Sequence, residues 1–132
     1  MKFIDTKGRE HKIDIRPSRW KRKEDGDGRG KFQTEVGELL VEKYPTAIIL
    51  EEFPCKGEGL FLDFFLPRIA LAIEVQGSQH TKFNKFFHKD KAAFMASKMR
   101  DKIKEQWCVI NKIKLIKIEW GEQRTNVLNM LP

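Results

Sequence analysis

The chain has 132 residues, of which 40% are hydrophobic, and its formal net charge is +7. This length and composition suit one folded domain and exclude an intrinsically disordered chain, and no apolar stretch approaches the roughly 20 residues of a membrane-spanning helix. Met1 is followed by a charged segment without the apolar run of a signal peptide, so we expect an intracellular protein that is not secreted. Cys55 and Cys108 are too few and too far apart for a disulfide framework or a zinc motif, and we interpret them as reduced thiols.

The distribution of charge is more informative than its total. Residues 1–34 carry eleven lysines and arginines against six acids, and residues 82–104 carry eight against two. Residues 35–81 reverse this ratio, with eight acids against three bases. An acidic middle between two basic blocks suits a protein that binds phosphates and acts on one of them through a cation. Lysine-rich helices can also be solvated faces only, so charge alone leaves nucleic-acid binding open.

In chain order, an alternating segment with a glycine turn predicts a small hairpin over residues 2–15. A basic arm follows at residues 16–23, and the glycines at positions 26, 28 and 30 indicate a hinge. We therefore expect residues 1–30 to form an N-terminal hairpin and arm, followed by a core domain over residues 31–132.

The core domain begins with apolar residues at helical spacing, which predict a helix over residues 31–43. Three strands are expected next, at residues 46–53, 60–66 and 69–76. The last two strands are separated by only Pro67 and Arg68, so they should form an antiparallel hairpin.

A long helix is then predicted over residues 89–110, with a buried stripe of Met95, Met99, Ile103 and Ile110 and with Trp107 alongside. A strand at residues 114–120 and a short helix at residues 122–131 complete the chain. The predicted fold class is α/β, with a mixed four-stranded sheet between helices.

Three polar residues interrupt the apolar strands of the predicted hairpin. Glu74 and Gln76 share one face of their strand because side chains alternate, and Asp63 can lie across the hairpin from Glu74. Two neighbouring buried carboxylates would repel each other, and a divalent cation removes that cost. Oxygen ligands with retained water suit Mg²⁺ or Mn²⁺, with the carbonyl of Val75 as a further ligand. An isolated aspartate in a strand is more often an edge or turn residue.

Two further residues are candidates for this site. His80 follows the strand after Gly77, and a histidine there can deprotonate or orient the attacking water near neutral pH. Taken alone, it would more often be a surface or capping residue. Glu35 lies early in the first helix and can reach the water shell of the metal, although a glutamate there also simply favours the helix dipole.

Asp63, Glu74-x-Gln76 and the order helix, three strands, helix, strand resemble the PD-(D/E)XK nuclease superfamily. Gly77-x-x-His80 and Arg100-Asp101-x-x-Lys104 resemble its very-short-patch-repair-like branch, which includes phage homing endonucleases with an EDxHD signature. The resemblance covers about residues 31–120. It implies a restriction-endonuclease-like core, Mg²⁺-dependent DNA cleavage, and a phage protein acting in the cytoplasm of a bacterial host.

The resemblance also assigns roles to residues. It makes Glu35 the first glutamate, Asp63 the central aspartate, Gln76 the variable position and His80 the histidine of the signature. Its final aspartate would be either of two residues, Asp90 or Asp101.

One departure from the superfamily pattern concerns Gln76, which stands where a lysine is usual. Glutamine can orient water but supplies no positive charge, so His80 or a basic residue of the long helix, such as Lys104, would have to replace the lysine. Asp101 and Lys104 are also spaced as a simple intrahelical ion pair.

DNA contacts are expected from the basic blocks. In the N-terminal arm the candidates are Arg19, Lys21, Arg22 and Lys23, with Trp20 placed to enter a groove. In the segment after His80 they are Lys82 and Lys85, which alternate with Phe83, Phe86 and Phe87.

The sequence therefore predicts a metal-dependent DNA endonuclease, of homing type or engaged in phage DNA processing, that makes a double-strand break only as a dimer or by two nicks. One alternative is a nicking nuclease selective for mismatches, branches or junctions. The other is a nucleic-acid-binding module on a nuclease scaffold that does not cut.

Overall fold

The computed structural model describes residues 1–22, 30–76 and 91–132. The elements in chain order are β1 (Lys2–Ile4), β2 (Glu10–Lys12), α1 (Lys31–Lys43), β3 (Leu50–Cys55), β4 (Leu60–Leu66), a 3-10 turn η1 (Pro67–Ile69), β5 (Leu71–Gln76), α2 (Lys91–Ile110), β6 (Lys114–Glu119) and α3 (Arg124–Met130). The fold class is thus mixed α/β, as predicted.

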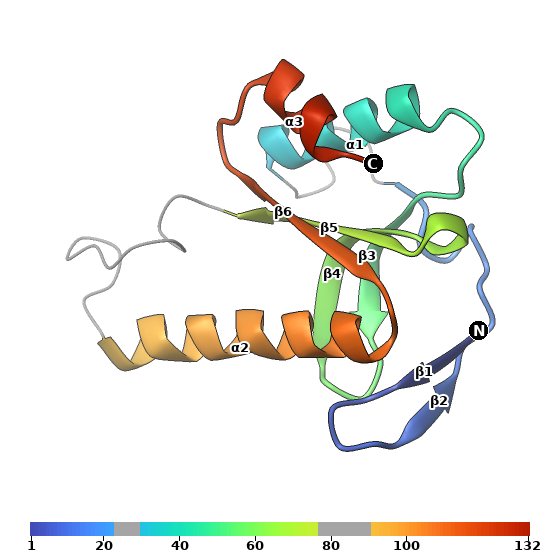
Figure 1. The fold of residues 1–132 in the computed structure, drawn as a ribbon, viewed down its shortest axis with the longest axis vertical. Helices are drawn as coiled ribbons and strands as arrows, with labels where there is room; N and C mark the ends of the chain where they lie inside the picture. Colours follow the sequence, from blue (N-terminus) through green and yellow to red (C-terminus); the bar gives the residue numbers. More distant parts are fainter. Residues whose placement is uncertain (23–29, 77–90) are drawn as a thin grey trace.

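The central sheet has four strands in the order β3-β4-β5-β6 (Figure 1). β4 is antiparallel to both β3 and β5, whereas β5 and β6 are parallel, so the sheet is mixed. Helices α1 and α3 cover one face, and α2 lies on the other (Figure 1). The parallel pair is made possible by the crossover through α2, since two parallel strands cannot be joined by a tight turn.

Several element boundaries differ from the predictions, two of them among the strands that lead to the site. The strand predicted at residues 46–53 begins only at Leu50, because residues 44–47 form a turn in which the Ala47 N–H donates to the Tyr44 carbonyl at 3.1 Å. It continues through Pro54, which is tolerated because β3 is an edge strand. The connection between β4 and β5 is also longer than two residues, since η1 is followed by Ala70 in the left-handed conformation.

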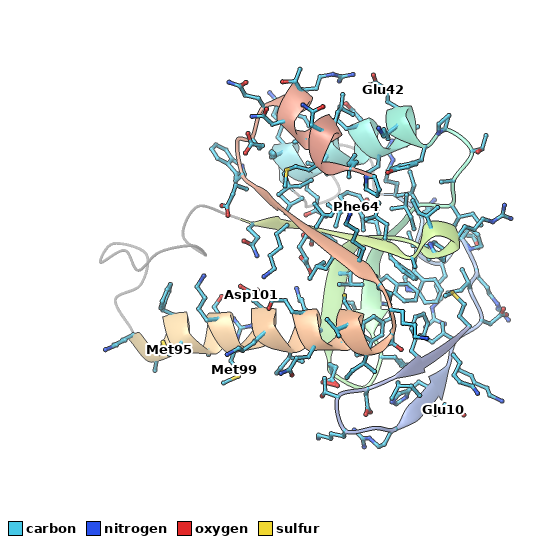
Figure 2. The ribbon with its side chains drawn as sticks, in the orientation of Figure 1. Glu10, Glu42, Phe64, Met95, Met99 and Asp101 are labelled. Atoms are coloured by element: carbon cyan, nitrogen blue, oxygen red, sulfur yellow. The ribbon has the colours of Figure 1, made fainter. Side chains whose placement is uncertain are left out.

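Each face of the sheet has its own hydrophobic core. On the α1 and α3 side, Val36, Leu40 and Val127 pack against Phe64 and Ile73 of the central strands (Figure 2). On the α2 side, the core contains Phe3, Phe53, Phe65, Ala72 and Trp107. The final helix packs over the sheet as expected, and the two cores fix the strands that carry the candidate site.

The predicted buried stripe of α2 is wrong. Met95 and Met99 are 57% and 59% exposed, and they lie on the side of the helix away from the sheet, opposite to Asp101 (Figure 2). Only Trp107 and Cys108 of this helix are buried. The helix therefore packs through its last turns, and its earlier turns present a polar, partly buried face to the sheet, formed by Ser97, Lys98, Asp101, Lys104 and Glu105.

The predicted N-terminal hairpin is present, formed by β1 and β2, and it packs against the end of α2. Phe3 stacks on Trp107 with ring centroids 5.2 Å apart, and the side-chain amide of Asn111 donates to the Ile4 carbonyl at 2.9 Å. The Asp5 carboxylate accepts from Arg9 Nε at 3.0 Å and lies 2.9 Å from His11 Nε2. These hydrogen bonds hold the pKa of Asp5 well below its usual range. The hairpin thus shares the core on the α2 side.

Among the described helices, none combines the length and the apolar character that crossing a bilayer requires.

Candidate functional site

Strands β4 and β5 separate at the position where the carboxylates lie. Their backbone pairing ends at Phe64 and Ile73, one residue short of Asp63 and Glu74. Beyond that point the Asp63 carboxylate accepts a hydrogen bond from the Val75 N–H, with Oδ2 2.7 Å from the nitrogen. The Asp63 side chain therefore replaces the backbone carbonyl that would normally accept from the Val75 N–H, because a partly buried N–H needs a hydrogen-bond acceptor. This contact fixes Asp63 against β5.

Glu74 lies on the face of β5 that is turned toward α2. Its strand neighbours Ile73 and Val75 pack on the opposite side with α1, as strand alternation requires. Glu74 is only 8% exposed. Burial, followed by the nearby Asp63 carboxylate, raises the pKa of Glu74 to about 8, against the opposing effect of Lys104. The structure thus brings the two predicted carboxylates together, and burial and the neighbouring aspartate make Glu74 harder to ionise than an ordinary glutamate.

Lys104 supplies the positive charge at this centre. Its Nζ lies 3.0 Å from Glu74 Oε1, and both side chains are largely buried. Glu74 and Asp63 raise the pKa of Lys104 despite its own burial, so the lysine is charged. The predicted alternative of an intrahelical ion pair between Asp101 and Lys104 is wrong, because the lysine points across to β5. Glu74 Oε1 receives no hydrogen bond of good geometry from the described residues, so this oxygen retains capacity for a further ligand.

Gln76 is half-buried at the end of β5, beside Glu119 of β6. Its carbonyl accepts from the Trp120 N–H at 2.7 Å, which fixes the end of the parallel pair. Asp63, Glu74 and Gln76 therefore lie on the two central strands, where these strands pass over the polar face of α2.

Two hollows flank the carboxylates along α2. The first, of about 490 Å³, lies between the β3–β4 end of the sheet and α2, and we call it the Phe61 cleft. Its lining residues are Glu52, Gly59, Leu60, Phe61, Asp63, Ser97, Arg100, Asp101 and Lys104. The second, of about 290 Å³, is lined by Gln76, Lys98, Asp101, Lys102, Glu105 and Lys117. Asp101 lines both hollows.

Glu35 does not join this group. It lies on α1, on the other side of the sheet, and lines a separate pocket of about 190 Å³ with Glu122 and Arg124. The expectation that Glu35 reaches the shell of a metal at Asp63 is therefore not supported by its position. Helical spacing placed Phe32 and Val36 in the core correctly, and their burial directs Glu35 toward α3.

Sequence reasoning missed one buried carboxylate on that side of the sheet. Glu51 of β3 is 2% exposed and accepts from Gln33 Nε2 of α1 at 3.0 Å. Its neighbour in sequence, Glu52, has a positive φ of 53°, which interrupts the regular extended backbone of β3 at that residue. This backbone turn has no clear sequence signal, because glycine or asparagine would be the usual residue there.

The basic arm is partly packed onto the protein. Trp20 lies edge-on against Phe53 with ring centroids 5.0 Å apart, and its carbonyl accepts from the Glu51 N–H at 2.7 Å. Arg19 stacks over the Trp20 ring at 5.0 Å and stays exposed, as does Lys21.

Arg22 turns inward, with Nη1 buried against α1. Its approach is possible because position 37 is glycine, where a Cβ would lie 3.0 Å from that nitrogen. Of the predicted DNA contacts in the arm, Arg19 and Lys21 are thus exposed, whereas Trp20 and Arg22 pack against the protein.

Several predicted site residues lie outside the described residues. They are Lys23 of the arm, His80 and Asp90 of the proposed signature, and Lys82 and Lys85 of the second basic block.

Asp63 and Glu74 are the carboxylates that could act as oxygen ligands to a divalent cation here, and Glu74 is also paired with Lys104. No group of three or more histidine, cysteine, aspartate or glutamate side chains in the described ranges is placed to hold a metal ion. One or two carboxylates with retained water are what Mg²⁺ commonly uses, whereas a structural zinc site needs four protein ligands. Cys55 and Cys108 are free and buried, and burial raises the pKa of the Cys108 thiol to about 12, so they are not thiolates.

Comparison with known proteins gives two relatives from viruses. The chain is 40% identical over 67 residues to uncharacterized protein 033L of Invertebrate iridescent virus 3. The aligned region is 51% of this chain and 34% of the relative. It is 38% identical over 62 residues to uncharacterized protein 307L of Invertebrate iridescent virus 6. That aligned region is 47% of this chain and 32% of the relative. No family model and no solved structure matches the chain. The chain thus matches about a third of the length of these two viral relatives.

Proposed function

We propose that the protein is a divalent-metal-dependent DNA endonuclease that hydrolyses phosphodiester bonds at a centre formed by Asp63, Glu74 and Lys104. The observation that carries the proposal is the pairing of two carboxylates from separating strands with one buried lysine from α2. A fold does not normally place a buried glutamate beside a partly buried aspartate for stability, because the arrangement costs free energy. Such costs are typical of sites that bind a charged ligand.

The element order and the residues Asp63, Glu74 and Gln76 support a restriction-endonuclease-like core within the PD-(D/E)XK superfamily. The superfamily lysine is absent at Gln76, and Lys104 offers its charge from α2 instead. A Mg²⁺ ion bound at Asp63 and Glu74 would supply a water of lowered pKa and neutralise charge on the phosphate. Lys104 would hold Glu74 in its ionised form and stabilise negative charge on the scissile phosphate.

A role in processing viral DNA is consistent with relatives from invertebrate iridescent viruses. We retain homing-type cleavage, action in the cytoplasm of a bacterial host, and a homodimer as hypotheses. One centre cuts one strand, so a double-strand break would require two copies of the chain or two successive nicks.

The direct test is incubation of supercoiled plasmid with the protein and Mg²⁺ or Mn²⁺. We expect relaxed and linear product, and none when EDTA is present. A protein that binds DNA in EDTA but gives no product with either metal over a wide range of concentrations would be a binding module on a nuclease scaffold.

Replacing Lys104 with methionine should slow cleavage about 100-fold, in keeping with the loss of one preorganised charge near a phosphate. Without the ammonium group the pKa of Glu74 rises further, so the rate should recover at higher pH as Glu74 ionises. Single-turnover rates measured from pH 6 to pH 9 test this, and Lys104→Arg should keep most of the activity and the original pH profile.

The matched control is Lys114→Met, which removes an exposed lysine at the far end of β6. If Lys104→Met is slower by the same factor at every pH, or no slower than Lys114→Met, the lysine does not act through Glu74.

A further inference from the structure

The Phe61 cleft contains an aromatic side chain that the packing of the strand leaves in solvent. Phe61 is 55% exposed, whereas the next residue, Leu62, is fully buried and packs in the core with Phe53. Phe61 and Asp63 both line the cleft beside α2. A single exposed aromatic residue is ordinary on a protein surface. This one lies two positions from a candidate catalytic carboxylate.

Arg100 of α2 also lines this cleft. Arg100 is exposed on α2, and no carboxylate among the described residues lies within salt-bridge distance of it. Lys104, one turn further along, is already paired with Glu74. Arg100 is therefore the guanidinium group of this cleft that is available to an external anion, and planar guanidinium groups suit phosphate.

The cleft thus combines an aromatic face, a cation and a carboxylate centre. Its volume of about 490 Å³ falls within the usual range of small-ligand sites, roughly 300–1,000 Å³. Bases stack on aromatic side chains irrespective of sequence, and arginine contacts the adjoining phosphate. A base inside a duplex is stacked between its neighbours, so it can meet Phe61 only after it has left the stack.

We propose that the Phe61 cleft binds one unpaired nucleotide of the strand that is cut, with its base on Phe61 and its phosphate at Arg100. This inference rests on the proposed nuclease function and makes the substrate a nucleic acid with unpaired bases beside the cleavage point, such as a flap, branch or mismatch. The preference follows from the cleft and requires no recognition of sequence.

The test is equilibrium binding in EDTA, where no cleavage occurs, by fluorescence anisotropy of labelled oligonucleotides. A duplex with a single-stranded flap should bind about tenfold more tightly than the fully paired duplex, in keeping with the stacking of one base. Phe61→Ala and Phe61→Leu should both remove this preference, because leucine keeps an apolar side chain without the ring. Phe61→Trp should retain it, and Arg100→Ala should weaken binding of the flap substrate.

The matched controls are Arg68→Ala and Ile69→Ala, which alter an exposed arginine and an exposed apolar residue in the turn at the other end of the same two strands. Both should keep the preference for unpaired DNA. The outcomes separate the two proposals. A protein that cuts plasmid but binds both substrates equally, or whose Phe61→Ala variant keeps the preference, overturns the cleft inference and leaves the nuclease proposal standing.

A protein that binds neither substrate and cuts no plasmid overturns both proposals. Free deoxyadenosine monophosphate provides the last arm of the test. If it displaces the flap substrate at micromolar concentration in a manner that depends on Phe61, the cleft is a site for free nucleotides, and the assignment to a substrate strand is wrong.

Discussion

Replacing Asp63 with asparagine is expected to reduce Mg²⁺-dependent cleavage by a factor on the order of 10³ or more, equivalent to at least about 4 kcal/mol of transition-state stabilisation. The asparagine oxygen can still accept the Val75 N–H, so the contact between β4 and β5 is preserved. What the substitution removes is the negative charge that would help to hold a cation. The measurement is the single-turnover cleavage rate at saturating protein, together with DNA affinity in EDTA.

DNA affinity should not fall in this variant, because the change removes a negative charge facing a polyanion. Asp14→Asn makes the same chemical change on an exposed residue paired with Arg16, and its cleavage rate should equal that of the wild-type protein. If Asp63→Asn cuts DNA at the wild-type rate, any cleavage comes from another part of the chain, and the carboxylate centre has a different role.

Replacing Glu74 with glutamine is expected to abolish cleavage and, at the same time, to stabilise the fold at pH 8. Burial and Asp63 raise the pKa of Glu74 to about 8, whereas its ordinary value is 4.5. A group with a raised pKa contributes its full stability below the unfolded value, and that contribution is lost as the pH rises toward the folded value. The wild-type free energy of unfolding should therefore fall between about pH 4.5 and pH 8 through this residue.

The size of this effect is at most about 5 kcal/mol across that window, given that one pKa unit corresponds to about 1.4 kcal/mol and that the value of about 8 already includes the opposing effect of Lys104. Urea unfolding of both proteins at pH 5 and pH 8 measures it. The gain from Glu74→Gln should be small at pH 5, where the acid is already protonated, and large at pH 8.

Glu38→Gln on α1 is the control, since this glutamate is exposed and its replacement should leave the pH dependence unchanged. Mg²⁺ should raise the thermal stability of the wild-type protein at pH 8 and have less effect on Glu74→Gln, because a ligand stabilises only the state that binds it. A Glu74→Gln protein that is less stable than wild type at pH 8 would show that the glutamate is a structural partner of Lys104. It would also remove the main argument for a site that costs stability.

The sequence predicted the strands around the site well because the signals there are local. Leu60–Leu66 is an apolar run closed by Pro67, and the alternation of Ile73, Glu74 and Val75 assigns each residue to a face. The position of Asp63 next to Glu74 followed from the short connection between these strands. The connection has two residues more than predicted, and the register still sets the two positions opposite each other.

The α2 helix shows where local signals are insufficient. Its methionines have the spacing of a buried stripe, yet they are exposed, because only the last turns of the helix reach the core on that side of the sheet. Periodicity identifies the faces of a helix, but it does not say which face meets the sheet. The partnership of Lys104 with Glu74 joins residues thirty positions apart, and it depends on that choice of face.

The sequence by itself determined the α/β class and the two neighbouring strands that carry Asp63, Glu74 and Gln76, because strand alternation and short connections act over a few residues. The tertiary structure alone decided that Glu35 lies on the far side of the sheet and that Arg22 turns inward. It also decided that Phe61 of β4 and Arg100 of α2 line the same cleft. These outcomes follow from how three helices pack on two faces of one sheet, and that packing is set by the whole core rather than by any one segment.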